Sequence, residues 1–326
     1  DQPRSRGLGD VYKRQGLYMA SNTNVREMIA KNNAKKGGFS DKIVPIILGI
    51  IAAISILTTI GILFTLITET ITFFTRVSIT EFLFTKDWNP TSSDPKYGIW
   101  ALILGTLKIT FIGTLVAVPI GLGAAIYLSE YASDKARRII KPILEILAGI
   151  PTIVFGFFAL TFVTPLLRTF IPQLDSFNSI SPGIVVGIMI VPIITSMSED
   201  AMASVPNKMR EGAFGLGSTK FEVATKVVLP AAASGVIASI VLGISRAIGE
   251  TMIVSLAAGS SPTSSLTLTS SIQTMTGYIV EIATGDATFG SDIYYSIYAV
   301  GFTLFIFTLI MNLISYWISK RYREEY

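Results

Sequence analysis

Six apolar stretches, most of them about 20 residues or longer, constrain this chain more than any other feature of its sequence. An α-helix needs roughly 20 apolar residues to cross the hydrocarbon core of a bilayer, and it satisfies its own backbone hydrogen bonds there. The predicted spans are Ile43–Ile67, Ile99–Leu128, Ile139–Leu160, Pro182–Met197, Val227–Ala257 and Tyr294–Ile318. The fourth is short and interrupted by proline. We therefore predict an all-α membrane protein with six transmembrane helices.

The composition supports a membrane protein. Half of the residues are hydrophobic and 15% are charged, and the mean hydropathy is +0.59. These values are too apolar for an ordinary water-soluble globular protein. The formal net charge of +4 would also suit a nucleic-acid partner. However, the basic residues are spread through short loops between apolar runs, so membrane orientation explains them better, and we expect contact with lipid and none with nucleic acid.

The distribution of Lys and Arg predicts the orientation. One side of the predicted membrane carries Arg26, Lys31, Lys35, Lys36, Lys42, Lys135, Arg137, Arg138, Lys141, Lys208, Arg210, Lys220, Lys226, Lys320, Arg321 and Arg323. The other side carries Arg76, Lys86, Lys96 and Arg168. Because cytoplasmic loops are enriched in basic residues, we expect a multi-pass protein of the cytoplasmic membrane with both termini in the cytoplasm.

The chain contains no cysteine and no histidine. Their absence excludes disulfides, thiolate nucleophiles, Cys/His metal sites and imidazole acid–base chemistry. The remaining candidates for catalysis are carboxylates, Ser, Thr, Lys and Tyr, which fall mostly in loops or at span ends. We therefore predict no catalytic residues, no metal site and no enzyme activity in this chain.

The outer connections, Glu69–Gly98 and Gly259–Asp292, are long and rich in Ser, Thr, Gly and Pro. They and the adjoining span ends carry aromatic residues that favour the membrane interface, namely Trp88, Trp100, Tyr278, Tyr294 and Tyr295. Anchoring at the interface is the simpler interpretation. The alternative is that these segments shape a docking surface for an extracytoplasmic partner.

A glycine-rich loop between the fourth and fifth spans is the most specific motif. It reads Glu211-Gly-Ala-Phe-Gly-Leu-Gly217, then nine residues, then Val227-Val-Leu229-Pro230. The small residues Gly212 and Ala213 would let a partner surface approach closely, and Glu211 could pair with a basic group on it. Proline is tolerated at the start of a helix, because no N–H is needed there. The alternative is a polar loop with chance glycines.

This loop resembles the signature loop of ABC importer permeases, written E-A-A, three residues, G, nine residues, I, one residue, L-P. The spacing agrees throughout, and Gly212 and Val227 are conservative departures. The chain has no G-x-x-x-x-G-K-[ST] phosphate cradle, since Gly212–Thr219 lacks the lysine. The resemblance implies that a separate ATPase docks here and binds the ATP and Mg²⁺, so we expect no cofactor in this chain.

Two charges fall inside the fifth predicted span. Arg246 and Glu250 are four residues apart, which predicts one shared helix face. An arginine at the middle of a span costs roughly 2.5–3.5 kcal/mol on insertion scales. One interpretation is an ion pair that neutralises itself. The other, which we favour, is that Arg246 offers donors to a passing oxyanion while Glu250 keeps that anion from binding too tightly.

The same span carries a ridge of small residues at i+4 spacing. They are Ala231, Gly235, Ser239, Gly243 and Ala247. Small residues let helix backbones approach closely in a membrane, so the ridge predicts a tightly packed neighbouring helix. We also expect the span to join the loop directly through Pro230, so that movement at Glu211 reaches the buried charges along a single helix.

Several segments resemble phosphate-specific importer permeases. They are Glu145–Pro151, Tyr127–Tyr131, Ser198–Pro206 and the Arg246–Thr251 segment. Gly249–Met252 and the outer Trp88-Asn-Pro with Tyr97-Gly98 are more similar to the PstC subunit than to its partner PstA. The likeness covers about Glu81 to Tyr322. It implies the binding-protein-dependent (MetI-like) fold, a role of Arg246 and Glu250 in phosphate passage, and three partners: a PstA-like permease, a PstB-like ATPase dimer and an extracytoplasmic PstS-like phosphate-binding protein.

The expected organisation follows from these features. Residues 1–42 form a cytoplasmic tail, 43–98 the first span and outer segment, 99–318 the permease domain with a coupling loop at 199–228, and 319–326 a second tail. The segment 1–18 is polar and Arg-rich, unlike the start of a membrane protein, and our hypothesis is that it is foreign and that Met19 is the native start. N-terminal sequencing would test this.

Lys108 departs from the neutral residue that the family leads us to expect in the second span. It could add a cation to the pathway, or reach the outer surface with its long side chain, which we favour. Glu145, Glu199 and Asp200 near the span ends are expected to be solvated or structural. The alternatives for the whole chain are a permease for sulfate or molybdate, a secondary transporter or channel, and a membrane enzyme.

Overall fold

The computed structural model describes Met28 and residues 39–285 and 287–321. Most of them are helical, and the strand pair among them joins β1 (Trp88–Asn89) to β2 (Lys96–Tyr97) in antiparallel register. The chain divides into two units between Thr65 and Leu66, and the second unit contains every predicted site residue. Residues 1–18, which we expect to be foreign, and most of both predicted tails lie outside the described residues.

Four predicted spans are single helices that are long and apolar enough to cross a bilayer. They are α2 (Phe39–Arg76), α4 (Trp100–Ile126), α8 (Ile180–Ala203) and α15 (Asp292–Arg321). Two bent helix pairs qualify as further spans, so the described residues hold up to six. The predicted all-α membrane fold is confirmed.

The third predicted span, Ile139–Leu160, is wrong as a continuous helix. The segments Asp134–Gly149 and Thr152–Arg168 meet at 88°. The first is α5 (Asp134–Gly149), and the second runs through α6 (Thr152–Phe158), the π-helical η2 (Ala159–Val163) and α7 (Thr164–Arg168). Pro151 explains the bend, because a proline disfavours helical backbone at the residue before it, and Ile150 is extended, at φ −67° and ψ 128°.

The fifth predicted span, Val227–Ala257, is broken twice. The segment Lys220–Ala231 meets α12 (Ala233–Ile248) at 75°, and α12 ends before α13 (Met252–Ala257). Pro230 lacks the N–H that would continue the helix, and the first break follows it at Ala232, at φ −88° and ψ 3°. The expectation that one helix links the loop to Arg246 and Glu250 is therefore wrong.

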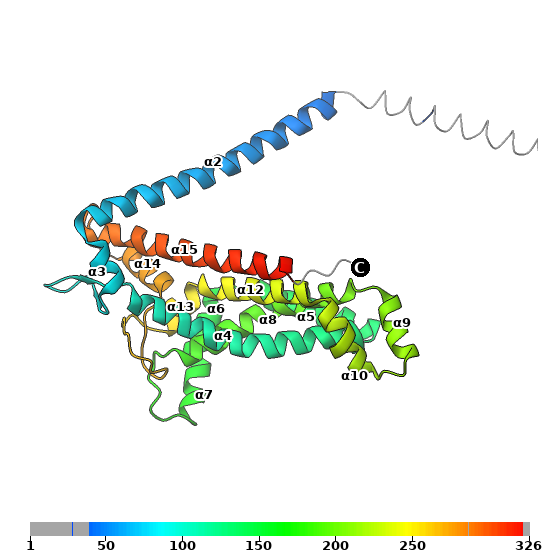
Figure 1. The fold of residues 1–326 in the computed structure, drawn as a ribbon. Helices are drawn as coiled ribbons and strands as arrows, with labels where there is room; N and C mark the ends of the chain where they lie inside the picture. Colours follow the sequence, from blue (N-terminus) through cyan, green and yellow to red (C-terminus); the bar gives the residue numbers. More distant parts are fainter. Residues whose placement is uncertain (1–27, 29–38, 286, 322–326) are drawn as a thin grey trace, which may run out of the picture. The chain divides into compact units, whose positions relative to one another are not determined.

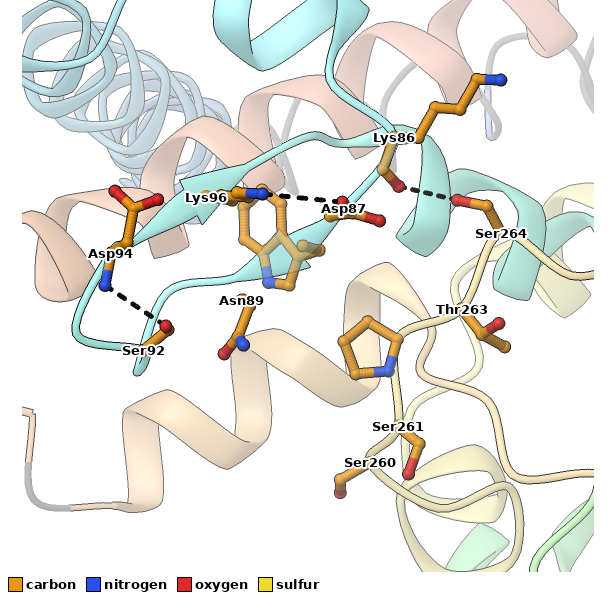
Figure 2. Close-up of a pocket in the computed structure, with 12 residues that line it drawn as sticks. Lys86, Asp87, Asn89, Ser92, Asp94, Lys96, Ser260, Ser261, Thr263 and Ser264 are labelled. Atoms are coloured by element: carbon orange, nitrogen blue, oxygen red, sulfur yellow. Dashed lines mark hydrogen bonds and ion pairs between the residues drawn. The ribbon is translucent and has the colours of Figure 1, made fainter.

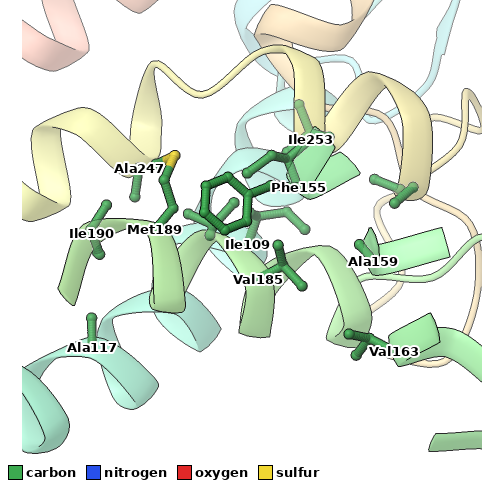
Figure 3. Close-up of a cluster of buried hydrophobic side chains, with 14 of the residues drawn as sticks. Ile109, Ala117, Phe155, Ala159, Val163, Val185, Met189, Ile190, Ala247 and Ile253 are labelled. Carbon is green, nitrogen blue, oxygen red and sulfur yellow. The ribbon is translucent and has the colours of Figure 1, made fainter. Parts of the chain in front are cut away.

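The centre of the second unit is an apolar core where α4, α6, α8, α12 and α13 meet (Figure 3). Ile109 and Ala117 come from α4, Val185 and Ile190 from α8, and Phe155 from α6. All five side chains are buried. The helices α12 and α13, between which the predicted charges lie, thus belong to this core.

Glycines and small residues bring these helices close together. A Cβ added at Gly187 of α8 would lie 2.8 Å from the Gly113 carbonyl oxygen of α4. The predicted ridge on α12 packs against α8 in the same way: a Cβ at Gly235 would lie 2.5 Å from Ala201 Cβ, and Ser239 Oγ lies 2.7 Å from Ser198 Oγ. The prediction of a tightly packed neighbour is confirmed.

Figure 1 shows α9 (Asn207–Gly215) and α10 (Lys220–Glu222) at one end of the second unit, and α3 (Ile79–Phe84), α7 and α14 (Met275–Thr284) at the other. We call these the loop end and the outer end. The helices α4, α8, α12 and α15 run between them. The loop end therefore carries the predicted coupling motif, and the outer end carries the long Ser/Thr-rich connections.

The outer end contains a buried aromatic cluster. Trp88 contacts Tyr278, with ring centroids 4.9 Å apart, and also Tyr97 and Phe82. Trp88, Tyr97 and Tyr278 are between 2 and 4% exposed. Interface anchoring therefore does not describe Trp88 or Tyr278, which hold the outer segments together. Trp100, in contrast, is 47% exposed, as an interface residue would be.

Candidate functional site: the loop end and the charged helix break

The predicted coupling loop folds into α9, a tight turn, and the short helical run of α10, η3 (Val223–Val228) and α11 (Leu229–Ala231). The turn depends on Gly217, whose φ of +87° is favoured by glycine alone. The Gly217 N–H donates to the Phe214 carbonyl at 2.9 Å. The G of the motif is therefore required by backbone geometry.

The loop presents small and apolar groups to solvent. Glu211 and Gly212 are exposed, Ala213 is half-buried, and a Cβ added at Gly212 would meet no atom within 4 Å. Leu216 is 90% exposed, and Phe214 and Phe221 are also exposed. Exposed apolar side chains beside small residues are typical of a protein-docking surface.

The other end of the motif, at Leu229 and Pro230, attaches the exposed loop surface to the helix bundle. Leu229 is half-buried and Pro230 exposed. Leu229 packs on a cluster of buried side chains: Ala125, Met202, Val205, Val223, Val228, Ala232 and Val236. The motif thus combines an exposed surface with the residues that seat it on the bundle.

A capping box begins the second half of the loop. Thr219 Oγ1 accepts from the Glu222 N–H at 3.3 Å, and Glu222 Oε2 accepts from the Thr219 N–H at 3.0 Å. The Thr219 N–H first, and then Lys226, lower the pKa of Glu222 to about 2. Lys226 Nζ lies 3.0 Å from Glu222 Oε1, and both side chains are well exposed.

A buried ion pair that the sequence did not reveal joins the loop to the bundle. Arg210 of α9 lies 2.9 Å from Glu130 of η1 (Tyr127–Tyr131), the π-helical extension of α4. Their side chains are 14% and 7% exposed. Glu130 lies within the segment Tyr127–Tyr131 quoted for the family, and Arg210 directly precedes the loop motif. However, 80 positions separate the two residues, and no local spacing predicts their contact.

Arg246 lies in the last turn of α12. Its side chain is exposed, and it makes no hydrogen bond or ion pair with any residue that the structure describes. An arginine inside an apolar span that is left without a protein partner is unusual, because such charges normally pair.

Glu250 is not on the helix face of Arg246, because α12 ends at Ile248. Its side chain is buried, and Oε1 accepts from the N–H groups of Met252 and Ile253, at 3.1 and 3.3 Å. The carboxylate thus satisfies the first N–H groups of α13, which would otherwise lack acceptors. The structure places both predicted residues at the same helix break without an ion pair between them.

Lys108 does not reach the outer surface, so that expectation is wrong. It is 8% exposed, and its Nζ donates to the carbonyl oxygens of Ser265 and Thr267, the latter at 3.1 Å. Its long side chain lies against the Ser/Thr-rich outer connection. The two carbonyl oxygens of this connection, and not a carboxylate, accept hydrogen bonds from the ammonium group. The backbone of this connection also packs directly on α4 at Gly105, because a Cβ added there would overlap the Gln273 carbonyl oxygen.

The outer end is hollowed by a polar groove of about 660 Å³ (Figure 2). Its walls are the β1–β2 hairpin and the segment Ser260–Ser264. Ser264 Oγ donates to the Lys86 carbonyl at 2.7 Å, and Lys96 lies 3.9 Å from Asp87. Lysines and aspartates alternate around this groove, so it has no single sign of charge.

A smaller cavity of about 220 Å³ lies between α5 and α8. Lys141 there lies 2.6 Å from the buried carboxylate of Glu199 and 3.9 Å from Asp200. The structural role expected for Glu199 is confirmed by this pair. Among the described residues, no group of three or more Asp, Glu, His or Cys side chains could hold a metal ion.

Comparison with solved structures supports the fold. A chain of the bacterial alginate ABC transporter, solved with an alginate pentasaccharide-bound periplasmic protein, has a TM-score of 0.61 at 16% identity, covering 89% of this chain and 99% of that chain. A chain of the inward-facing MetNI methionine ABC transporter has a TM-score of 0.53 at 17% identity, covering 69% of this chain and 98% of that one.

Sequence relatives are closer. The probable ABC transporter permease protein YqgH of Bacillus subtilis is 35% identical over 248 residues, covering 75% of this chain and 79% of its own length. The phosphate transport system permease protein PstC of Xylella fastidiosa is 34% identical, with 72% and 76% covered, and that of Mesorhizobium japonicum 33% identical, with 74% and 78% covered.

The family model for binding-protein-dependent transport system inner membrane components matches residues 117–324. That range contains the loop motif, Arg246 and Glu250, and the helices α8, α12 and α13 that carry or pack against them. This chain, a multi-pass membrane protein, belongs to the family of binding-protein-dependent transport system inner membrane components.

Proposed function

We propose that this chain is a permease subunit of an ATP-driven importer that moves inorganic phosphate across the cytoplasmic membrane. The observation that carries the proposal is Arg246, an exposed guanidinium in the last turn of α12 that pairs with no side chain in the part of the chain that the structure describes. Its planar fork of donors suits an oxyanion. The relatives named PstC, at 33–34% identity over most of the chain, favour phosphate as that oxyanion.

Glu250 supplies a second element of selectivity. One carboxylate oxygen is held by the N–H groups of Met252 and Ile253, so the side chain is fixed beside the break. A fixed carboxylate can accept the O–H of monohydrogen phosphate, whereas sulfate has no proton to donate. A site built around such an acceptor discriminates strongly against a ligand that leaves it unpaired.

Three exposed parts of the chain are available to the partners in this proposal: the loop surface, the Arg246 side chain and the outer end. A separate ATPase would cover Gly212, Leu216 and Phe221, and it would bind the ATP and Mg²⁺, so that this chain does not hydrolyse ATP itself. A second permease subunit would cover Arg246 and complete the pathway. An extracytoplasmic phosphate-binding protein would deliver the ion at the outer end. This arrangement puts the loop end and both termini in the cytoplasm, in agreement with the distribution of Lys and Arg.

Uptake of labelled phosphate into proteoliposomes tests the proposal. The chain is reconstituted with the proteins that co-purify with it, ATP is supplied on the loop side, and sulfate and molybdate are added as competitors. Phosphate uptake that needs ATP and resists both competitors is expected. Preferred uptake of sulfate or molybdate would establish the closest alternative, and uptake without the ATPase would establish a secondary transporter.

A further inference from the structure

We propose that Arg210 and Glu130 form a clamp that makes the coupling loop move together with α4 and α8, so that Arg210 is a positioning residue for transport. The inference rests on the proposed function, in which an ATPase pushes on this loop. It goes further by assigning the mechanical connection to one side chain. The helical link bends by 75° near Ala232, and a side-chain contact that bypasses this bend transmits movement of the loop directly to α4 and α8.

A single guanidinium makes the contacts to both spans. Arg210 Nη2 donates to Glu130 Oε1 at 2.9 Å and to the Met202 carbonyl at 2.8 Å. Nε lies 3.3 Å from each Glu130 oxygen, and Nη1 donates to the Val205 carbonyl and Asn207 Oδ1. Met202 lies in the last turn of α8, and Glu130 at the end of the helix that continues α4. The donors of α9 therefore bind the ends of two different spans.

Burial makes this connection stiff. The side chains of Arg210 and Glu130 are 14% and 7% exposed, and water cannot readily replace either partner. A charge removed from water is strongly disfavoured without its counter-charge. Displacing α9 from the bundle would separate the two charges, whereas moving α4 and α8 with it keeps them together.

The turn that contains Glu130 is also bound by a residue of α5. Arg137 of α5 donates to the Leu128 carbonyl at 2.7 Å and to the Ser129 carbonyl at 2.6 Å, and Ser129 Oγ donates to Glu130 Oε1 at 2.9 Å. Basic groups at a helix C-terminus are favourable for the helix dipole. Glu130 is therefore held rigidly to the bundle, so that a force on Glu130 is passed to the helices α4 and α5.

The Lys226–Glu222 pair provides a matched control on the same loop. Its distance is 3.0 Å, close to that of the clamp, but its side chains are 71% and 40% exposed, and both residues belong to the loop. It cannot connect the loop to a span. Arg210→Met and Lys226→Met thus remove one cation each from comparable pairs, with different expected results.

The experiment measures phosphate uptake and ATP hydrolysis in parallel, in the complete reconstituted complex. For Arg210→Met we expect uptake to fall at least about tenfold while ATP hydrolysis stays within about twofold, because Gly212 and Leu216 remain exposed for docking. Glu130→Gln keeps the shape and should show the same uncoupling, more weakly. Lys226→Met should change neither rate. Normal coupling in Arg210→Met, or a proportional loss of both rates, would overturn the clamp.

Two further readouts cover other failures. If Arg210→Met does not assemble with its partners, the test is made on Glu130→Gln, by the ratio of phosphate imported to ATP hydrolysed. If the wild-type complex imports no phosphate, the proposed function fails, and hydrogen exchange of residues 207–215 then judges the clamp. Faster exchange in Arg210→Met than in Lys226→Met supports it, and equal exchange in both would reject it.

Discussion

Arg210 and Arg246 are the same residue type in opposite surroundings. Arg210, at the loop end, is nearly buried and bound to Glu130 and to the carbonyls of Met202 and Val205. Arg246, at the break after α12, is exposed and has no protein partner among the described residues. An arginine whose donors are all engaged holds structure together, while one whose donors are free can bind a ligand. The environment decides the role of each.

Removal of the free guanidinium should have the largest effect. We expect Arg246→Ala to lower phosphate uptake by about 100-fold, the equivalent of losing two charge-assisted hydrogen bonds to the ion. Membrane level and ATPase binding should be unchanged, because Arg246 supports no other described residue. Uptake and co-purification measured on the same preparation test this, with Arg246→Lys as the control that keeps the charge. Normal uptake by Arg246→Ala would show that the free arginine is not in the pathway.

The turn of the coupling loop should be nearly as sensitive. Gly217→Pro removes the N–H that bonds to Phe214 and forces φ from +87° toward −65°. Such an incompatible proline costs about 3 kcal/mol or more, enough to misplace α9 against α10.

We expect this variant to lose transport while still inserting into the membrane, which protease accessibility and uptake measure together. Gly215→Ala is the matched control, because Gly215 lacks the positive φ of Gly217 and a Cβ there meets no atom within 4 Å. Retained transport in Gly217→Pro would mean that the turn is dispensable.

The buried carboxylate should affect selectivity more than rate. Glu250→Gln keeps an oxygen that can accept from the Met252 and Ile253 N–H groups but removes the charge. We expect the preference for phosphate over sulfate to fall about tenfold, since an amide can donate to sulfate as well as accept from phosphate. Competition uptake measures the ratio. Unchanged uptake and unchanged preference would exclude Glu250 from ion recognition and leave it as a helix cap.

The exposed pair on the loop should have the smallest effect. Lys226→Met should leave transport within about twofold of wild type, as exposed ion pairs contribute little. The main cause of the lowered pKa of Glu222, the Thr219 N–H, remains, so the capping box survives at neutral pH. A loss of transport comparable to that of Arg210→Met would erase the contrast between the buried and the exposed pair.

The helix breaks show where sequence patterns were insufficient. Hydropathy located Val227–Ala257 as one apolar stretch, and neither its bend near Ala232 nor the end of α12 at Ile248 was predicted, although Pro230 and Gly249 lie close to them. The length of an apolar run indicates whether a segment can cross a membrane. Proline and the packing of neighbouring helices decide whether that segment forms one straight helix. The predicted helix face shared by Arg246 and Glu250 was wrong for the same reason, because α12 ends at Ile248.

The sequence by itself determined the membrane class, the approximate spans, the loop motif and the small-residue ridge, because hydrophobicity, glycine requirements and close packing are local properties. The contact of Arg210 with Glu130, the burial of Lys108 under Ser265 and Thr267, and the capping of α13 by Glu250 were decided only by the tertiary structure. Each joins residues through space or reorients them at a helix break, where electrostatics depends on burial and not on spacing along the chain.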